Sequence, residues 1–310
     1  MPELPEVQTV VNDLNKRVAG RKITGVWFDW PKMLKDPLDQ QRNKIAHKHV
    51  EVFQKVIKGK KILEVKRRAK NILMYLSGNL VLLTHLKMTG HYLVGKWKIE
   101  RAKTRGVRPR AIPISPPEMV NDPYNRYIHI IFYLDNGQQL ALSDLRKFAK
   151  AVLGTKEQIE NLPELLKLGP EANDPKLTLE KFKTLILKER RKIKQVLMDP
   201  EVIAGIGNIY SDEILWQSRI HPFKPANKLK DEEIKIMYLA MKIILAKALK
   251  LRGTSSSDYR DTAGKKGGYD KVLLAYDREG EPCKRCGAKI VRKKIGGRSA
   301  HFCPRCQVLI

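Results

Sequence analysis

Short runs of apolar residues, many of them branched or aromatic, dominate the chain between Arg21 and Val152. Gly78-Asn79 and Asp135-Asn136-Gly137 stand between successive runs, and these residue types favour the tight turns of β-hairpins. The pattern predicts an antiparallel β-sandwich or barrel. The predicted strands are Ile23–Trp30, Ile62–Arg67, Ile72–Leu76, Leu80–Leu86, Tyr127–Leu134 and Gln139–Leu142.

Apolar residues at helical spacing mark the start of the chain and much of its second half. A helix is predicted from Pro5 to about Val18, with Gly20 as its stop signal. After Thr155 a turn-rich stretch predicts a linker, and helical periodicity follows it. The four further helices predicted are Leu177–Leu187, Ile193–Met198, Ser211–Ser218 and Asp231–Leu251.

One stretch among the predicted strands has a different composition. Residues 97–123 hold five prolines and many basic residues, which predicts a long surface loop. We therefore expect a β-rich N-terminal domain over residues 1–154, a linker over 155–176, a helical domain over 177–255 and a distinct C-terminal segment over 256–310.

The net charge points to a polyanionic partner. The 310 residues include 61 Lys and Arg against 33 Asp and Glu, a formal charge of +28. A solvated basic face does not account for so large an imbalance, whereas nucleic acid does. No apolar run reaches the ~18 residues of a membrane span, and the N-terminus lacks the pattern of a signal peptide. We expect a cytoplasmic, monomeric protein that binds no membrane.

All four cysteines of the chain fall into one constellation. Cys283 and Cys286 form one Cys-x2-Cys knuckle, and Cys303 and Cys306 form a second after sixteen intervening residues. Four thiolates in this spacing are typical of tetrahedral zinc, and a set without an open position predicts one structural Zn²⁺ rather than a catalytic one. Disulfides are the alternative, but a cytosolic location argues against them. Arg298 lies between the knuckles after two glycines and suits a phosphate.

The first six residues, Met-Pro-Glu-Leu-Pro-Glu, carry two interpretations. Removal of Met1 leaves Pro2 with a free secondary amine, a nucleophile that gives an iminium ion with an aldehyde-level carbon. Glu3 and Glu6 could then transfer protons. Alternatively Pro5 begins a helix, with the two glutamates near its positive end. On these residues alone the helix start is the more common arrangement.

Five segments occur in the order seen in bacterial formamidopyrimidine-DNA glycosylases, which the chain resembles from end to end. The resemblance implies an α+β multidomain protein, with an N-terminal antiparallel β-sandwich behind a leading helix, and a helix-two-turns-helix domain with a four-cysteine zinc finger. It also implies double-stranded DNA with oxidised bases as the partner. The segments are Pro2–Val7, Arg67–Lys70, His85–Gly90, Gly205–Tyr210 and the finger that carries Arg298.

The resemblance also implies catalytic roles. Pro2 resembles the Schiff-base nucleophile, Glu3 the general acid that assists departure of the base or opening of the sugar ring, and Glu6 a supporting carboxylate. Lys70 resembles the lysine that contacts the phosphate near the lesion and is linked to β-elimination. Arg298 resembles the finger arginine that grips phosphate and assists δ-elimination.

Further residues are implied to contact DNA. Met88, Arg146 and Phe148 match the set that fills the space left by an extruded base, although Phe148 alone suggests a core residue. Lys194 and Asn208 resemble residues of the phosphate clamp, and the glycine-rich stretch Gly253–Tyr269 matches the region that covers the extruded base. A plain interhelical turn around Asn208 and a merely flexible loop are the alternatives.

Four departures from the family pattern concern substrate choice, one of them a basic loop around Arg101 to Arg110 that is longer than typical. Ala149 replaces a usual glycine, Tyr127 takes the place of a phosphate-contacting histidine, and Lys87 replaces a glycine beside Met88. We expect a bifunctional glycosylase and abasic-site lyase for oxidised purines in base excision repair. The alternatives are an endonuclease VIII-type enzyme for oxidised pyrimidines, which Leu4 disfavours, and a non-catalytic, zinc-stabilised DNA-binding protein.

Overall fold

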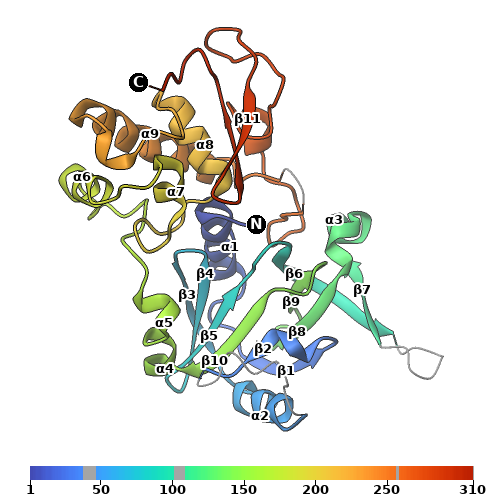
Figure 1. The fold of residues 1–310 in the computed structure, drawn as a ribbon. Coiled ribbons are helices and arrows are strands. Elements are labelled where there is room, and N and C mark those ends of the chain that lie inside the picture. The colour runs from blue at the N-terminus through green and yellow to red at the C-terminus, as the bar shows by residue number, and fades with distance from the viewer. Residues whose placement is uncertain (38–46, 101–108, 256–257, 310) are drawn as a thin grey trace. The chain divides into compact units, whose positions relative to one another are not determined.

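The computed structural model describes residues 1–37, 47–100, 109–255 and 258–309, and the chain divides into two compact units (Figure 1). The first unit comprises Met1–Pro2, Glu6–Leu166 and Thr254–Gly267. The second comprises Glu3–Pro5, Lys167–Gly253 and Gly268–Ile310. Each unit has a buried apolar core of its own.

The first unit is built on two five-stranded sheets among the described residues. One sheet has the strand order β1-β8-β9-β6-β7 and the other β2-β10-β5-β4-β3. Neighbouring strands are antiparallel except the short parallel pair of β2 and β10. The strands are β1 (Ile23–Phe28), β2 (Leu34–Lys35), β3 (Ile62–Arg68), β4 (Asn71–Leu76), β5 (Leu80–His85), β6 (Gly90–Glu100), β7 (Arg110–Ser115), β8 (Ile128–Leu134), β9 (Gln139–Asp144) and β10 (Lys150–Thr155).

Helix α1 (Leu4–Arg17) shares one core with both sheets. Val7, Val10 and Leu14 are fully buried, together with side chains from β4, β6 and β8. The predicted leading helix and β-sandwich are therefore confirmed. The other helices of this unit are α2 (His47–Ile57), α3 (Pro117–Asn121), α4 (Lys156–Glu160) and α5 (Pro163–Leu166), with single 3₁₀ turns at η1 (Pro31–Met33) and η2 (Pro123–Arg126).

The prediction of a long loop over residues 97–123 is wrong. Strand β6 continues to Glu100, and β7, α3 and η2 follow within the same stretch. Pro113 lies in β7, which is the outer strand of its sheet, and proline is tolerated there because one side of an edge strand needs no hydrogen-bond donors. Residues 101–108, the centre of the predicted loop, lie outside the described residues.

The second unit is mainly helical. Its core joins α9 to α6 and α8 through residues such as Phe182, Ile214 and Met241. All four predicted helices are present, and α8 begins three positions before the predicted Ser211. The elements are α6 (Leu179–Leu187), α7 (Ile193–Met198), α8 (Asn208–Gln217), η3 (Ala226–Lys228), α9 (Asp231–Lys250), η4 (Tyr269–Val272) and the hairpin of β11 (Val291–Ile295) and β12 (Arg298–Phe302).

A search of the described residues for a helix long and apolar enough to cross a lipid bilayer finds none.

Candidate functional site

The carboxylate of Glu3 lies at the N-terminus of α8. It accepts hydrogen bonds from the backbone N–H groups of Gly207 at 2.7 Å, Ile209 at 2.9 Å and Tyr210 at 3.3 Å. The glutamate is 2% exposed. The first N–H groups of a helix have no partner within the helix and carry its positive dipole end, so they stabilise a carboxylate at this place. Glu3 is thus a fixed and nearly buried acid directly bonded to Pro2.

Pro2 and Glu6 are both buried in the first unit. The Glu6 carboxylate accepts a hydrogen bond of 2.7 Å from the backbone N–H of Thr254. The Gly205 carbonyl accepts from the backbone N–H of Leu4 at 3.0 Å in the second unit. The N-terminal hexapeptide is therefore held by contacts with distant parts of the chain. A helix start alone does not account for these contacts.

Lys70 lies in the two-residue turn between β3 and β4, where Ala69 has a φ of +52°. Asn71 in β4 and Lys150 in β10 both pair with His85, which ends β5. Burial, followed by the charges of Lys87, Lys150 and Lys70, lowers the pKa of His85 to about 3. The imidazole is therefore neutral near physiological pH, and the cationic groups around it favour an anion such as a phosphate.

Two turns of the first unit bring Met88, Arg146 and Phe148 into one region. The fully buried Asp144 at the end of β9 accepts hydrogen bonds from the Thr89 hydroxyl and from the backbone N–H groups of Arg146 and Ala149. The Arg146 backbone N–H also donates to the Thr89 hydroxyl at 3.0 Å. The turn that carries Met88 is therefore joined to the turn that carries the other two residues.

Phe148 is on the surface, so the alternative interpretation of this residue as part of the core is wrong. The residue is 54% exposed, and the Arg146 guanidinium carbon lies 4.7 Å from the centre of the Phe148 ring. Ala149, which replaces the usual glycine, is buried, and its backbone N–H still reaches Asp144 at 2.7 Å. An exposed aromatic ring stacked with a cation can enter a base stack.

Lys194 is fully buried, and its ammonium lies 2.5 Å from Asp212 Oδ1. The other carboxylate oxygen of Asp212 accepts from the backbone N–H of His301 at 3.0 Å and lies 3.1 Å from its ring nitrogen Nδ1. Burial lowers the pKa of Lys194, although the charge of Asp212 acts in the opposite direction. In this structure Lys194 supports strand β12 through Asp212 instead of facing solvent.

Arg298 is exposed at the first position of β12. Gly296 and Gly297 form the turn before it with φ angles of +53° and +75°, a conformation that favours glycine. A Cβ on Gly296 would lie 2.5 Å from Gln195 Nε2, so the turn lies close against α7. Asn208 is the first residue of α8, beside the N–H groups that hold Glu3.

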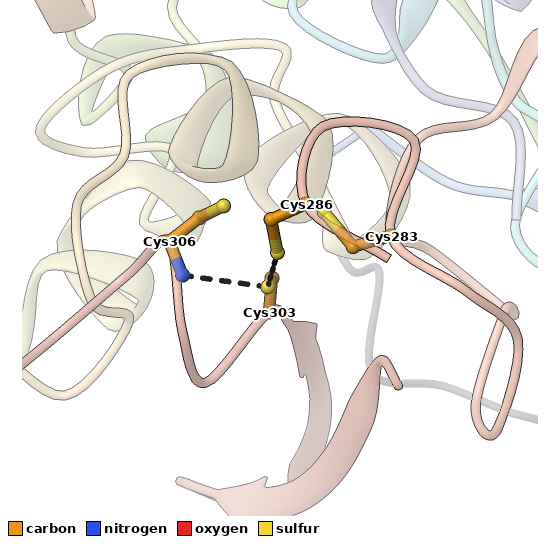
Figure 2. Close-up of side chains that lie close together, drawn as sticks. All are labelled: Cys283, Cys286, Cys303 and Cys306. Carbon is orange, nitrogen blue, oxygen red and sulfur yellow. Dashed lines mark hydrogen bonds between the residues drawn. The ribbon is translucent and has the colours of Figure 1, made fainter. Parts of the chain in front are cut away.

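The four cysteines of the second unit lie on two facing loops, with Cys303 directly after β12 (Figure 2). Their sulfur atoms all lie within 4.8 Å of one another, and Cys286 Sγ is 3.4 Å from Cys303 Sγ. Tetrahedral zinc with Zn–S bonds of about 2.3 Å needs sulfur atoms about 3.8 Å apart. The arrangement therefore fits one zinc ion with four thiolate ligands and no open position.

Comparison with known proteins supports this assignment of the parts. Residues 1–151 match the family described as the formamidopyrimidine-DNA glycosylase N-terminal domain, residues 168–260 match its H2TH domain, and residues 280–308 match a zinc finger found in FPG and IleRS. A curated formamidopyrimidine-DNA glycosylase from Pelotomaculum thermopropionicum is 38% identical over 99% of both chains. The chain belongs to the formamidopyrimidine-DNA glycosylase family. Another relative of that name, from Heliobacterium modesticaldum, is 36% identical over 99% of this chain and 100% of its own.

Solved structures of this family resemble the chain over its length. A complex of the Lactococcus lactis Fpg with DNA that contains an abasic site has a TM-score of 0.79 and 32% identity, with 99% of this chain and 100% of that chain covered. The MutM (Fpg) protein of Thermus thermophilus has a TM-score of 0.78 and 32% identity, covering 99% and 98%. In the present chain, Cys283, Cys286, Cys303 and Cys306 are the ligands of one structural zinc ion.

Two aspartates that hold other site residues in place were not predicted from the sequence. Asp144 joins the turns of Met88 and Arg146, and Asp212 links Lys194 to His301. An aspartate at the end of a strand or within a helix carries no pattern that distinguishes it from a solvated one. The local signal for Asp144 is its position two residues before Arg146, which the resemblance assigns to DNA contact.

Proposed function

We propose that this protein excises oxidised purines from DNA and then cleaves the abasic strand by β,δ-elimination, working as a monomer in the cytoplasm. It is a DNA glycosylase of base excision repair by family. The observation that supports the full proposal is the position of Glu3. Its buried carboxylate is fixed by three backbone N–H groups, and the residue is bonded to Pro2, whose amine becomes free when Met1 is removed.

The chemistry begins with a proton transfer between the first two residues of the processed chain. The Glu3 carboxylate accepts a proton from the Pro2 ammonium, which leaves a neutral secondary amine. The amine nitrogen forms a bond to C1′ of the damaged nucleotide, and the bond between C1′ and the base breaks with its electron pair leaving on the base. The nitrogen then loses its N–H proton, and a proton taken up by the departing base balances this loss. Glu3 then returns its proton to the sugar ring oxygen as the ring opens, and the nitrogen becomes an iminium cation.

The iminium cation drives the strand cleavage that follows. It withdraws electrons from C2′, so a C2′ proton is lost and the bond from C3′ to its phosphate breaks. A second elimination releases the 5′ phosphate, and water hydrolyses the remaining C1′–nitrogen bond to free Pro2. Glu6 supports this part of the chain through its contact with Thr254.

The remaining predicted residues suit contacts with DNA. Lys70 lies among the cations around His85, and the exposed Arg298 stands at the hairpin tip, so both suit phosphates. Met88, Arg146 and Phe148 would fill the stack after a base leaves it. Asn208 belongs to the helix end that favours anions, and Lys194 acts through Asp212 on the finger.

A panel of lesion duplexes treated with borohydride tests the proposal. Borohydride reduces the iminium and fixes the protein to DNA, so we expect trapping with 8-oxoguanine and formamidopyrimidine duplexes. Faster reaction with thymine glycol than with 8-oxoguanine would instead identify an enzyme of the endonuclease VIII type. Binding without trapping on any duplex would identify a non-catalytic DNA-binding protein.

Removal of zinc is expected to weaken DNA binding. The finger packs on α8 through Trp216, Cys283 and Cys303, so loss of the metal should release the hairpin that carries Arg298. Each lost phosphate contact should reduce the slope of log affinity against log salt by about 1. Fluorescence anisotropy with and without chelator measures both quantities. Arg298→Ala in the zinc-loaded protein is the control for the arginine alone, and unchanged affinity after chelation would refute the bracing role.

A further inference from the structure

Residues 258–267, here called the capping loop, belong to the stretch Gly253–Tyr269 that resembles the cover of the extruded base. Residues 256 and 257 of that stretch lie outside the described residues. This loop packs within the first unit on residues 116–126, here called the anchor segment, which contains α3 and η2. Ionic, aromatic and hydrogen-bond contacts join the two at several points.

The central contact is an ion pair whose arginine is buried. Arg260 of the capping loop is 2% exposed, and its Nε lies 2.5 Å from Asp122 Oδ2 of the anchor segment. The guanidinium carbon also lies 4.8 Å from the centre of the Tyr124 ring. A buried cation is strongly destabilising without its partner, so these contacts fix the position of Arg260.

The far end of the capping loop has a second, neutral contact. Asn125 is fully buried and donates from Nδ2 to the Gly264 carbonyl at 3.3 Å. Gly264 has a φ of +81°, and a Cβ there would lie 2.7 Å from Asn125 Nδ2. A side chain at this position would be strained by the backbone conformation and would displace Asn125.

The middle of the loop is attached elsewhere in the same unit. The Thr262 carbonyl accepts from the backbone N–H of Val94 at 2.9 Å and from Arg17 Nη1 at 2.9 Å. The Thr262 hydroxyl donates to Asp13 at 3.0 Å. These bonds do not involve the anchor segment. Loss of the Arg260 pair should therefore loosen the loop on one side without releasing it altogether.

We propose that the anchor segment fixes the capping loop in one conformation before DNA binds, and that the Arg260–Asp122 pair thereby positions the loop for the base-excision step. This inference rests on the proposed function. A loop ordered in advance does not have to be ordered by the substrate, so more of the binding energy remains for holding the extruded base. Arg260 and Asp122 are positioning residues because they act through the loop.

An abasic site provides the control that separates this role from general stability. It contains no base to be covered, so cleavage at a preformed abasic site should not depend on the capping loop. Excision of 8-oxoguanine should depend on it. The ratio of the two rates in one protein sample is therefore a measure that a general loss of folded enzyme does not change.

Asp122→Asn is the first test variant. Asparagine retains an oxygen that can accept from the Tyr124 backbone N–H, which now donates to Asp122 at 2.9 Å, but it removes the charge that faces Arg260. We expect single-turnover excision of 8-oxoguanine to fall about tenfold to a hundredfold, as mispositioning does, with abasic-site cleavage changed less than about twofold. Amide hydrogen exchange over residues 261–265 should become faster.

Glu118→Gln is the matched control, because Glu118 forms the exposed pair with Lys265 at 3.1 Å, and exposed pairs contribute little. Its rate ratio should equal that of the parent. If Asp122→Asn loses both activities, Tyr124→Leu provides the test, because it removes the ring beneath Arg260 and keeps the ion pair. We expect Tyr124→Leu to lower the ratio of 8-oxoguanine excision to abasic-site cleavage, by less than Asp122→Asn does. An unchanged rate ratio in the folded variants overturns the anchoring role, whereas a parent protein inactive on every lesion overturns the proposed function instead.

Discussion

Protein that retains Met1 is expected to bind lesion DNA and form no borohydride-trapped complex with it. The Pro2 nitrogen is then part of an amide, and its lone pair is delocalised into the carbonyl group, so it cannot attack C1′. In the structure, which includes Met1, Pro2 is buried while Met1 is 41% exposed. Mass spectrometry identifies protein with and without Met1. The yield of borohydride-trapped complex from each is then compared on gels at equal DNA occupancy.

Pro2→Gly in the processed protein should also lose trapping and strand cleavage. Glycine offers a flexible primary amine, whose imine can lose a proton and become neutral, so the electron sink is weaker and the nucleophile is less well placed. We expect a decrease of about a thousandfold or more in cleavage, in line with loss of a positioned nucleophile. Affinity for DNA should remain. A trapped complex of undiminished yield would show that another amine, such as a lysine, is the nucleophile.

Glu3→Gln is expected to reduce base excision by about a hundredfold to ten-thousandfold, the usual contribution of a positioned acid–base group. Glutamine can keep part of the contact with the N–H groups of Gly207 and Ile209 through its amide oxygen. It cannot accept the proton of Pro2 and pass it on. Single-turnover rates on an 8-oxoguanine duplex, with unfolding monitored by circular dichroism, measure the effect.

Glu6→Gln is the matched comparison for Glu3→Gln. Its carboxylate is as deeply buried and accepts from the Thr254 backbone N–H at 2.7 Å, but it is further from the amine in sequence. We expect a smaller loss of rate. A Glu3→Gln enzyme with parental excision rates would remove Glu3 from the mechanism.

Helices and strands could be predicted from the sequence where apolar periodicity extends over many residues or where typical turn residues separate two strands. The helix over Asp231–Lys250 has its predicted start, and Gly78 and Asn79 adopt φ angles of +79° and +57° in the predicted hairpin turn. Turn chemistry and apolar spacing act within a few residues, so a single chain displays them. The zinc cysteines belong to this class because their ligand spacing is local.

The sequence was least informative where the surroundings of a residue decide its position in the fold. Pro113 suggested a loop, but it lies in β7 at a sheet edge, and strand order is not written in local sequence. Phe148 taken alone suggested the core, whereas the resemblance placed it among the residues that contact DNA, and the folded chain exposes it beside Arg146. The phosphate-clamp role that the resemblance implies for Lys194 stays a prediction, and nothing in the local sequence indicates that its ammonium lies buried beside Asp212. Each outcome depends on a partner or an edge that only the folded chain defines.

The contact between Glu3 and Ile209 spans 206 positions, and this has a consequence for the order of synthesis. At ~5–20 residues per second, roughly 10–40 s pass between translation of the acid and translation of its helix. Throughout that interval the α8 N–H groups that bind Glu3 do not yet exist, and Met1 is accessible to the enzyme that removes it. Once α8 has formed, its N–H groups hold the Glu3 carboxylate and restrict the segment that a processing enzyme has to bind. A cell that makes this protein faster than it processes new chains should therefore accumulate folded protein that retains Met1 and does not cleave DNA.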